Sequence, residues 1–175
     1  GMSIAFEPLT AAPRGSDEIQ DLAPLHNFQR TLSLATGLSL AVVGAEGHCL
    51  SAFSHPADRI HASLLASQEL IQRILDPANA HFQVARGPGG LLFMCHPVQI
   101  RGYLFGYVLA GPVWEVPPNR VVLSELSELV HLPVEEVEQA VRFHPAPIPL
   151  DLTQGRDLTS SLADLTAQIV YDRRQ

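Results

Sequence analysis

The sequence contains no lysine, so its eleven basic residues are all arginines, and eighteen acidic residues outnumber them. The formal net charge is −7, and no basic stripe or recognition helix of the kind that binds DNA or RNA is present. We therefore expect no direct nucleic-acid contact by this chain. Charged residues make up only 17% of the sequence, below the roughly 25% typical of soluble domains, which favours a surface that is covered in a dimer or by another neighbouring protein.

Cysteine and long apolar runs are also scarce. Cys49 and Cys95 are the two cysteines, too few for a disulfide framework, which favours a reducing cytoplasm. The longest apolar run is shorter than the roughly 20 residues that a membrane-spanning helix needs, and no charged-then-apolar signal segment opens the chain. We expect a cytoplasmic protein with no membrane partner.

The usual signatures of metal, phosphate and hydrolytic sites are missing as well. The eight histidines are scattered, with no pair at the i,i+4 spacing of a helical zinc site. The loop Gly87–Gly90 lacks the lysine and the strand-glycine-helix order of a phosphate-binding loop. No Ser-His-Asp or paired-carboxylate arrangement stands out. We therefore expect no metal and no cofactor.

The most structured pattern in the chain runs from Leu91 to Trp114. It consists of two apolar stretches of strand length, rich in β-branched and aromatic residues and separated by Arg101-Gly102. This pattern predicts an antiparallel hairpin at the centre of a sheet. Both faces of the hairpin are apolar, so we expect one face to be covered by helices and the other by more protein or by a ligand.

Strict alternation assigns the side chains of this hairpin to two faces. In the first strand, one face holds Leu92, Met94, His96 and Val98, and the other holds Leu91, Phe93, Cys95 and Pro97. In the second strand, one face holds Tyr103, Phe105, Tyr107, Leu109 and Val113, and the other holds Leu104, Gly106, Val108 and Ala110. Gly106 and Gly111 weaken a strand unless a backbone or a ligand must approach closely there.

The rest of the chain predicts an α+β domain. Helical periodicity from near Asp21 to Thr36, with Asp21 as a possible N-cap and Gly37 as C-cap, precedes strands over 38–43 and 48–53. We expect a helix over 56–75, a short strand over 81–85, two helices after residues 117–119 and Pro133, a proline-rich connector over 143–149, and a last helix from about Asp157. Residues 1–15 are predicted to be a loose arm and residues 16–175 a single domain.

Four stretches in this order resemble a known family, the PocR-type sensory domain. They are ATGLSLAVVGAEGHCLS (35–51), CHPVQIRGYLFGYVLAGPV (95–113), ELVHLPVEEVEQAVRFHPAPI (128–148) and the terminal LADLTAQIV. This domain is a PAS/GAF-like ligand-binding module found in front of transcription-factor and signalling output domains. The resemblance implies a PAS/GAF-like antiparallel sheet flanked by N- and C-terminal helices, and a small organic, predominantly apolar ligand.

The resemblance does not extend to the cysteines of the family. Residues 56–80 contain no cysteine, and the position just before the hairpin reads Arg86-Gly87-Pro88-Gly89. Cys95-His96 lies later, inside the strand itself, so no cysteine role is carried over to it.

A ligand is predicted to bind between the central sheet and the helix over 56–75, and the six residues predicted to line the site come from both faces of the hairpin, because the sequence leaves open which face bears the pocket. Phe93, Cys95, Phe105 and Tyr107 would form the apolar wall, and His96 and Arg86 would make polar contacts. Ligand binding would favour one arrangement of the sheet and the terminal helices and so signal to an output domain or protein. We expect a homodimer formed through the first and last helices.

Two other functions remain open from the sequence. The first is an enzyme on a similar fold that uses Cys95 or His96, although neighbours in a strand point to opposite faces and cannot both enter one site. The second is a ligand-free interaction or dimerisation module whose own aromatic residues fill the core.

Overall fold

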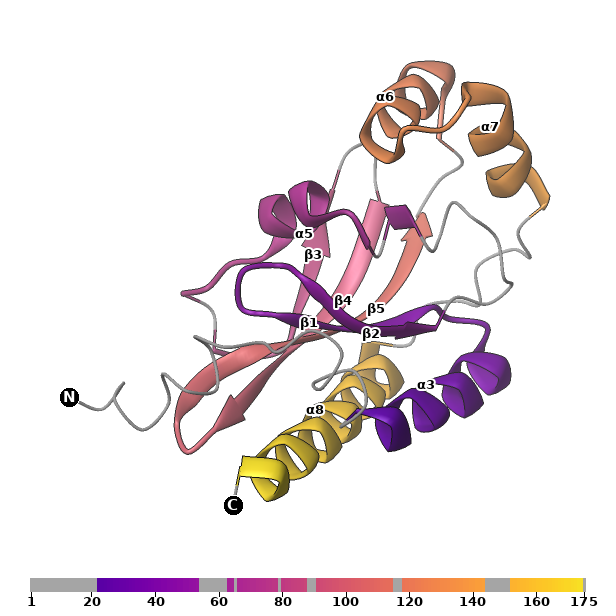
Figure 1. The fold of residues 1–175 in the computed structure, drawn as a ribbon. Helices are drawn as coiled ribbons and strands as arrows, with labels where there is room; N and C mark the ends of the chain where they lie inside the picture. The colour runs from indigo at the N-terminus through magenta and orange to yellow at the C-terminus, as the bar shows by residue number, and fades with distance from the viewer. Residues whose placement is uncertain are drawn as a thin grey trace.

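The computed structural model describes residues 22–53, 63–64, 66–78, 80–87, 91–114, 118–143 and 152–174. Its elements follow the order α3, β1, β2, α5, β3, β4, β5, α6, α7, α8, which is the predicted succession of helices and strands. They form a five-stranded antiparallel sheet with helices on both sides (Figure 1), so the predicted α+β class, with an antiparallel sheet flanked by N- and C-terminal helices, is confirmed. The predicted arm and the Asp21 cap lie outside the described residues.

The predicted hairpin forms the middle of the sheet. The strands are β1 (Leu40–Gly44), β2 (Cys49–Phe53), β3 (Gln83–Arg86), β4 (Leu91–Ile100) and β5 (Tyr103–Trp114), in the spatial order β2-β1-β5-β4-β3. Arg101 and Gly102 connect β4 to β5 with φ angles of 53° and 81°. Two consecutive positive φ angles are typical of the two-residue type I′ turn, whose twist matches that of the strands.

Alternation predicts the two faces of β4 correctly but fails in β5. Val98 pairs with Gly106 whereas Gln99 pairs with Leu104, so Phe105 is an extra residue, a β-bulge that shifts the alternation by one. Phe105 consequently points to the opposite face from Tyr107. The prediction that these two aromatic side chains share a face is wrong.

The bulge lies where two backbones meet at close range. Gly106 pairs with Gly44 of β1, and a Cβ atom at Gly106 would collide with the carbonyl oxygen of Val43. This glycine therefore permits a close backbone approach, as its place in a strand predicts.

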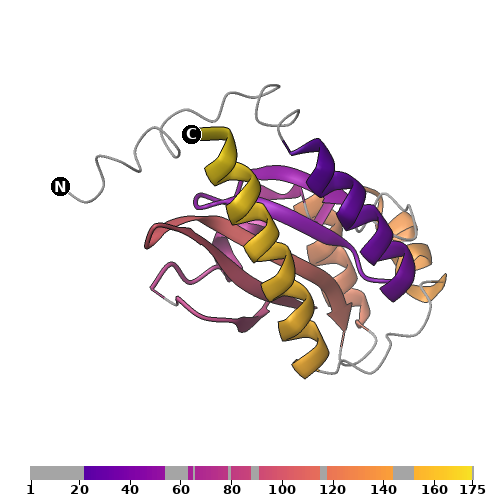
Figure 2. The same ribbon diagram turned by 90° about the horizontal axis from the view of Figure 1, so that it is seen from below.

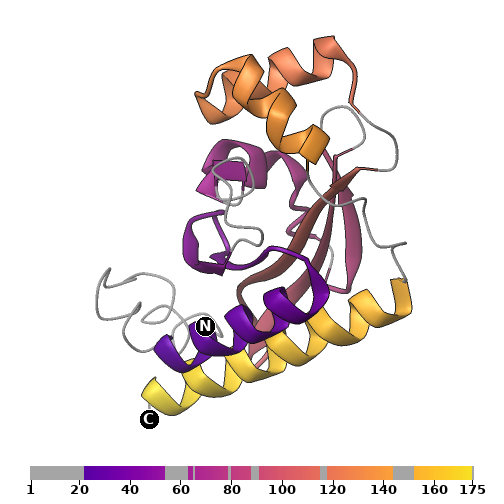
Figure 3. The same cartoon turned by 90° about the vertical axis from the view of Figure 1, so that its right-hand side faces the viewer.

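One face of the sheet is covered by two helices that lie side by side, α3 (Ala23–Thr36) and α8 (Leu152–Arg174), as Figures 2 and 3 show. We call the buried apolar residues between these two helices and the sheet the α8-side cluster. Its members are Leu22, Leu25, Leu40, Val42, Met94, Val98, Ile100, Phe105, Val108, Ala110, Leu162, Ala163 and Val170. Gly37 ends α3 with a φ of 75°, as predicted, while the N-cap Leu22 makes no side-chain capping bond. Helix α8 begins five residues earlier than expected.

The opposite face is covered by the short helix α5 (Gln68–Ile74). The α5-side cluster consists of Ala41, Val43, Leu64, Leu70, Ile71, Ile74, Ala85, Leu91, Phe93, Cys95, Tyr107, Leu109, Leu123, Leu126, Val130 and Val137. The prediction of one helix over 56–75 is wrong at Ser67, which is extended and caps α5 by accepting a hydrogen bond from Leu70 N at 3.2 Å.

Two further helices lie at one end of the sheet (Figure 1). They are α6 (Arg120–Val130), capped by Asn119, and α7 (Val134–Phe143). Their inward residues, such as Leu126 and Val137, extend the α5-side cluster beyond the sheet. The predicted connector lies outside the described residues, apart from Phe143 at the end of α7. Within the described parts of the chain, every helix is too short or too polar to cross a membrane.

Candidate functional site

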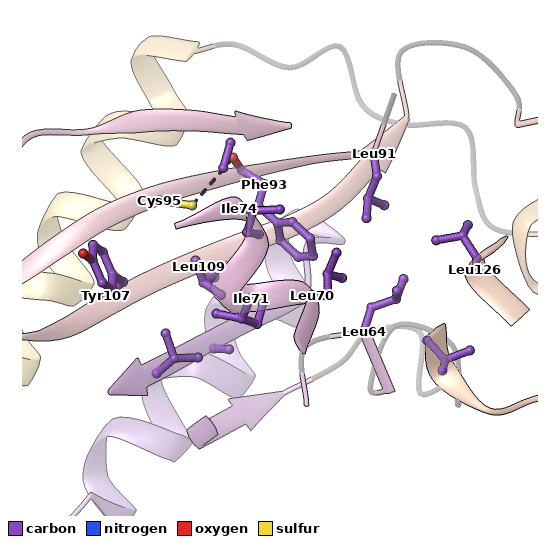
Figure 4. Close-up of a cluster of buried hydrophobic side chains, with 14 of the residues drawn as sticks. Leu64, Leu70, Ile71, Ile74, Leu91, Phe93, Cys95, Tyr107, Leu109 and Leu126 are labelled. Atoms are coloured by element: carbon purple, nitrogen blue, oxygen red, sulfur yellow. Dashed lines mark hydrogen bonds between the residues drawn. The ribbon is translucent and has the colours of Figure 1, made fainter. Parts of the chain in front are cut away.

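The α5-side cluster contains three of the six predicted site residues. Phe93 and Cys95 from β4 and Tyr107 from β5 each have an exposed fraction of 0% and point to the same face (Figure 4). The buried face of α5 covers them with Leu70, Ile71 and Ile74. The structure therefore brings this part of the predicted wall together under the predicted element of the chain.

The other three predicted residues lie on the opposite face or at its margin. Phe105 belongs to the α8-side cluster because of the bulge. His96 pairs with Val108, a member of that same cluster, and is half-buried with its Nδ1 2.9 Å from the carbonyl oxygen of Pro97. Arg86 is exposed at the end of the edge strand β3. None of these three side chains joins the α5-side cluster.

Among the described residues of the α5-side cluster, the hydroxyl of Tyr107 is the one buried side-chain polar atom without a hydrogen-bond partner. Its hydroxyl is fully buried and makes no hydrogen bond to any residue that the structure describes. A buried hydroxyl without a partner costs roughly 1–3 kcal/mol, so such groups are rare in folded proteins and invite an explanation. A group that arrives with a bound molecule would satisfy this hydroxyl.

Burial and ionisable neighbours change the pKa of the Tyr107 hydroxyl. Burial raises its pKa, and the nearby Asp76 carboxyl and Cys95 thiol raise the pKa further. Asp76 lies just beyond the end of α5 and accepts a hydrogen bond from Ala78 N at 3.0 Å. The hydroxyl is therefore held protonated, available to donate or accept a hydrogen bond, and close to a negative charge that disfavours anions.

The Cys95 thiol is also held in its neutral form. Burial raises its pKa from 9.0 to about 12 despite a backbone hydrogen bond with Ala85 that lowers it, and its Sγ lies 3.9 Å from the carbonyl oxygen of Phe93. The thiolate is the nucleophilic form of cysteine. A protonated, enclosed thiol has the properties of an apolar wall residue.

Cys95 and His96 do not form a reactive pair. Cys95 lies in the α5-side cluster, whereas His96 faces the other side of the sheet, as the alternation of a strand predicts. A thiol-imidazole dyad would need both side chains in one site. The arrangement therefore gives no support to an enzyme that uses these two residues together.

The polar contacts that helix α5 makes with its surroundings are exposed. The side-chain amides of Gln68 and Gln72 donate to the carbonyl oxygen of Glu46 in the β1–β2 turn, at 3.3 and 2.8 Å. Arg73 lies 4.0 Å from Glu125 of α6, with both side chains about half exposed. Such surface pairs contribute about 0–1 kcal/mol, so the burial of its three apolar residues is the main force that holds α5 on the sheet.

The far end of the cluster is purely apolar. Leu64, Leu91 and Leu126 gather there, away from Tyr107 (Figure 4). The site therefore has two ends, an apolar one beside α6 and one with a single hydroxyl. Within the described ranges, no group of three or more histidine, cysteine, aspartate or glutamate residues could hold a metal ion.

Sequence reasoning missed two features of the site. The apolar face predicted for the helix over 56–75 consists of Ile60, Leu64, Ile71 and Ile74. Its described members Leu64, Ile71 and Ile74 are buried as predicted, but the fully buried Leu70 was not included in that face. Asp76 raises the pKa of Tyr107 from a distant segment of the chain, and no local pattern reveals such an electrostatic influence. A glycine inside a strand often accompanies a bulge, so Gly106 was the available signal for the reversal of Phe105.

Comparison of the chain with models of known protein families, with curated proteins and with solved structures finds no match.

Proposed function

We propose that this chain is a sensory domain that binds a small, predominantly apolar molecule between the sheet and α5. The observation that carries the proposal is the Tyr107 hydroxyl, a fully buried polar group without a partner among the described residues, at one end of an apolar cluster. An apolar site with few, well-placed polar groups is typical of small-molecule binding.

The ligand that fits this chemistry is neutral. A long apolar part would contact Phe93, Ile71 and Ile74, and one alcohol, carbonyl or amide group would hydrogen-bond to the Tyr107 hydroxyl. A carboxylate is disfavoured for two reasons. It would be buried among apolar side chains, which is costly for a charge, and it would lie near the Asp76 carboxyl, which already raises the pKa of Tyr107.

Entry of the ligand would require α5 to move. A helix of seven residues is too short to be stable by itself, and its polar contacts to Glu46 and Glu125 are exposed and weak. Elements with few stabilising contacts open at the lowest free-energy cost. Displacement of α5 would expose the wall formed by Phe93, Cys95 and Tyr107 while leaving the sheet intact.

The bound state would signal through the helices on the other face. We propose that α3 and α8 connect the domain to an output partner and to a second copy of the chain, and that the protein acts in the cytoplasm. The proposed site itself involves no enzymatic step, since the thiol of Cys95 is held protonated.

Native mass spectrometry of the recombinant protein, followed by denaturation and identification of released molecules, tests this function. We expect a neutral organic molecule at near-stoichiometric occupancy in the wild type, and an occupancy or affinity lowered about 5- to 100-fold in Tyr107→Phe, because one hydrogen bond is lost. Tyr103→Phe is the matched control, since Tyr103 packs on the α8 side, and it should leave occupancy unchanged.

A second function is favoured by a different observation, the complete burial of the cluster by its own side chains. Leu64, Leu70 and Phe93 all have an exposed fraction of 0%, as a ligand-free interaction module would require. Release of no organic molecule, together with no shift in melting temperature on exposure to a library of neutral small molecules, would favour that module over the sensory domain.

A further inference from the structure

The strand that forms the wall of the proposed site also contacts the helix on the other face. Met94 lies between Phe93 and Cys95 in β4, and its side chain, 1% exposed, belongs to the α8-side cluster. Its neighbours in the sheet are Val84 and Ala110, so β4 is paired on both edges at this point. Successive residues of one strand therefore face the proposed site, then α8, then the site again.

Helix α8 has a glycine where Met94 meets it. Gly155 is buried, and a Cβ atom built on it would overlap the Met94 sulfur and come within 3.0 Å of Met94 Cε. Glycine inside a helix costs about 1 kcal/mol relative to alanine. Here it lets the thioether rest directly on the helix backbone, with no intervening side chain to absorb a movement.

The same region of α8 satisfies its own polar groups. The Thr159 hydroxyl, one turn beyond Gly155, donates to the Gly155 carbonyl at 2.9 Å and lies 3.2 Å from the Arg156 carbonyl. The Thr159 hydroxyl is therefore bonded within α8 itself.

Contacts at its two ends supplement the buried packing of α8 on the sheet. Near the start, the Arg156 guanidinium lies 5.3 Å from the ring centre of Phe82, just before β3. Near the end, Arg101 of the β4–β5 turn donates from Nη2 to the Tyr171 hydroxyl at 2.6 Å and lies 4.8 Å from the ring centre. Helix α8 therefore contacts the sheet at both ends and at Met94.

We propose that Met94 and Gly155 form a direct link through which a change in the α5-side cluster moves the N-terminal turns of α8. The inference rests on the function proposed above, because it assigns the route by which occupancy of that site reaches an output helix. A shift of the β4 backbone at Phe93 pushes or withdraws the Met94 sulfur, and the α8 backbone at Gly155 follows.

A double-mutant cycle read by amide hydrogen exchange tests the link without any ligand. Phe93→Ala perturbs the site side of β4, and Met94→Ala removes the link. We expect Phe93→Ala to change the exchange rates of the amides at 155–159 at least 5-fold more than those at 166–170, which serve as an internal reference for global destabilisation. In the Met94→Ala background, this selective change should disappear.

Val98→Ala is the matched control, because Val98 is a buried residue of the same strand and the same cluster but has no glycine of α8 against it. The selective change should persist in its background. Additive behaviour of Phe93→Ala and Met94→Ala, or an equal loss in the Val98→Ala background, would overturn the link. If Phe93→Ala does not fold, Phe93→Leu supports the same cycle. If the selective change in exchange at 155–159 is observed but no ligand co-purifies with the protein, the link between Met94 and Gly155 stands and the proposed ligand-binding function is contradicted.

Discussion

The two faces of the sheet differ in how completely the protein satisfies its own groups. On the α8 side, two helices of 14 and 23 residues cover the sheet, and each buried polar side chain of these helices has a hydrogen-bond partner, as seen for Gln29, Ser33, Thr159 and Thr166. On the α5 side, a helix of seven residues covers the sheet, and the buried Tyr107 hydroxyl has no partner in the described structure.

This difference suggests that the α8 side is the rigid face of the sheet and that the α5 side is the face that can open. Long helices with satisfied polar groups open only at a high free-energy cost, whereas a seven-residue helix that buries three apolar side chains and makes only exposed polar contacts opens locally at a lower cost. A protein can therefore place a displaceable cover on one face without weakening the other.

The largest contrast is expected between two truncations of fully buried side chains. Leu162→Ala on the α8 side should lower the free energy of unfolding by about 3–5 kcal/mol, because long helices packed on the sheet cannot close the cavity. Ile71→Ala on the α5 side should cost only about 2 kcal/mol, because the short helix can shift inward. Urea unfolding at neutral pH measures both values. An equal or larger loss for Ile71→Ala would mean that the two faces are equally rigid.

Alkaline pH should weaken the α5 side through its buried thiol. The Cys95 pKa rises from 9.0 to about 12 on folding, so the unfolded chain loses this proton first. Its stabilising contribution is complete below pH 9 and is lost between pH 9 and about 12, at up to about 1.4 kcal/mol per pH unit. Tyr107, with its raised pKa, acts in the same direction.

The absence of lysine makes this effect measurable, because few other groups titrate in the same range. Urea unfolding at pH 8, 9 and 10 should show a steeper loss in the wild type than in Cys95→Ala. The comparison concerns slopes and not absolute values, since the substitution itself changes packing. Identical slopes would show that the thiol is not held neutral by the α5-side cluster.

The element order and the central hairpin were predictable because their signals are local. The two apolar runs rich in β-branched and aromatic residues in 91–114, the turn at Arg101-Gly102 and the C-cap at Gly37 each depend on neighbouring residues. Both apolar faces of the hairpin are covered, by α5 on one side and by α3 and α8 on the other, as the apolar pattern predicts.

The composition of the site was only half predictable. The one extra residue in β5 moves the side chains on its N-terminal side to the opposite face of the sheet from the one that strict alternation predicts. Phe105 was therefore assigned to the wrong face. The buried positions Ile71 and Ile74 of α5 were predicted correctly, but the break of the helix at Ser67 and the burial of Leu70 were missed. The proximity of Asp76 to Tyr107 depends on packing between distant segments, which neither periodicity nor composition encodes.

The free energy of unfolding of ligand-free Tyr107→Phe is the most direct measurement of the central claim. If the hydroxyl awaits a partner from a ligand, its removal relieves a buried unpaired group, and stability should stay the same or rise by about 1 kcal/mol. Urea unfolding after removal of any bound molecule gives this value, with Tyr103→Phe as the control on the other face. A loss of 1 kcal/mol or more would show that the hydroxyl stabilises the fold by itself, and would contradict its assignment as the polar anchor of a binding site.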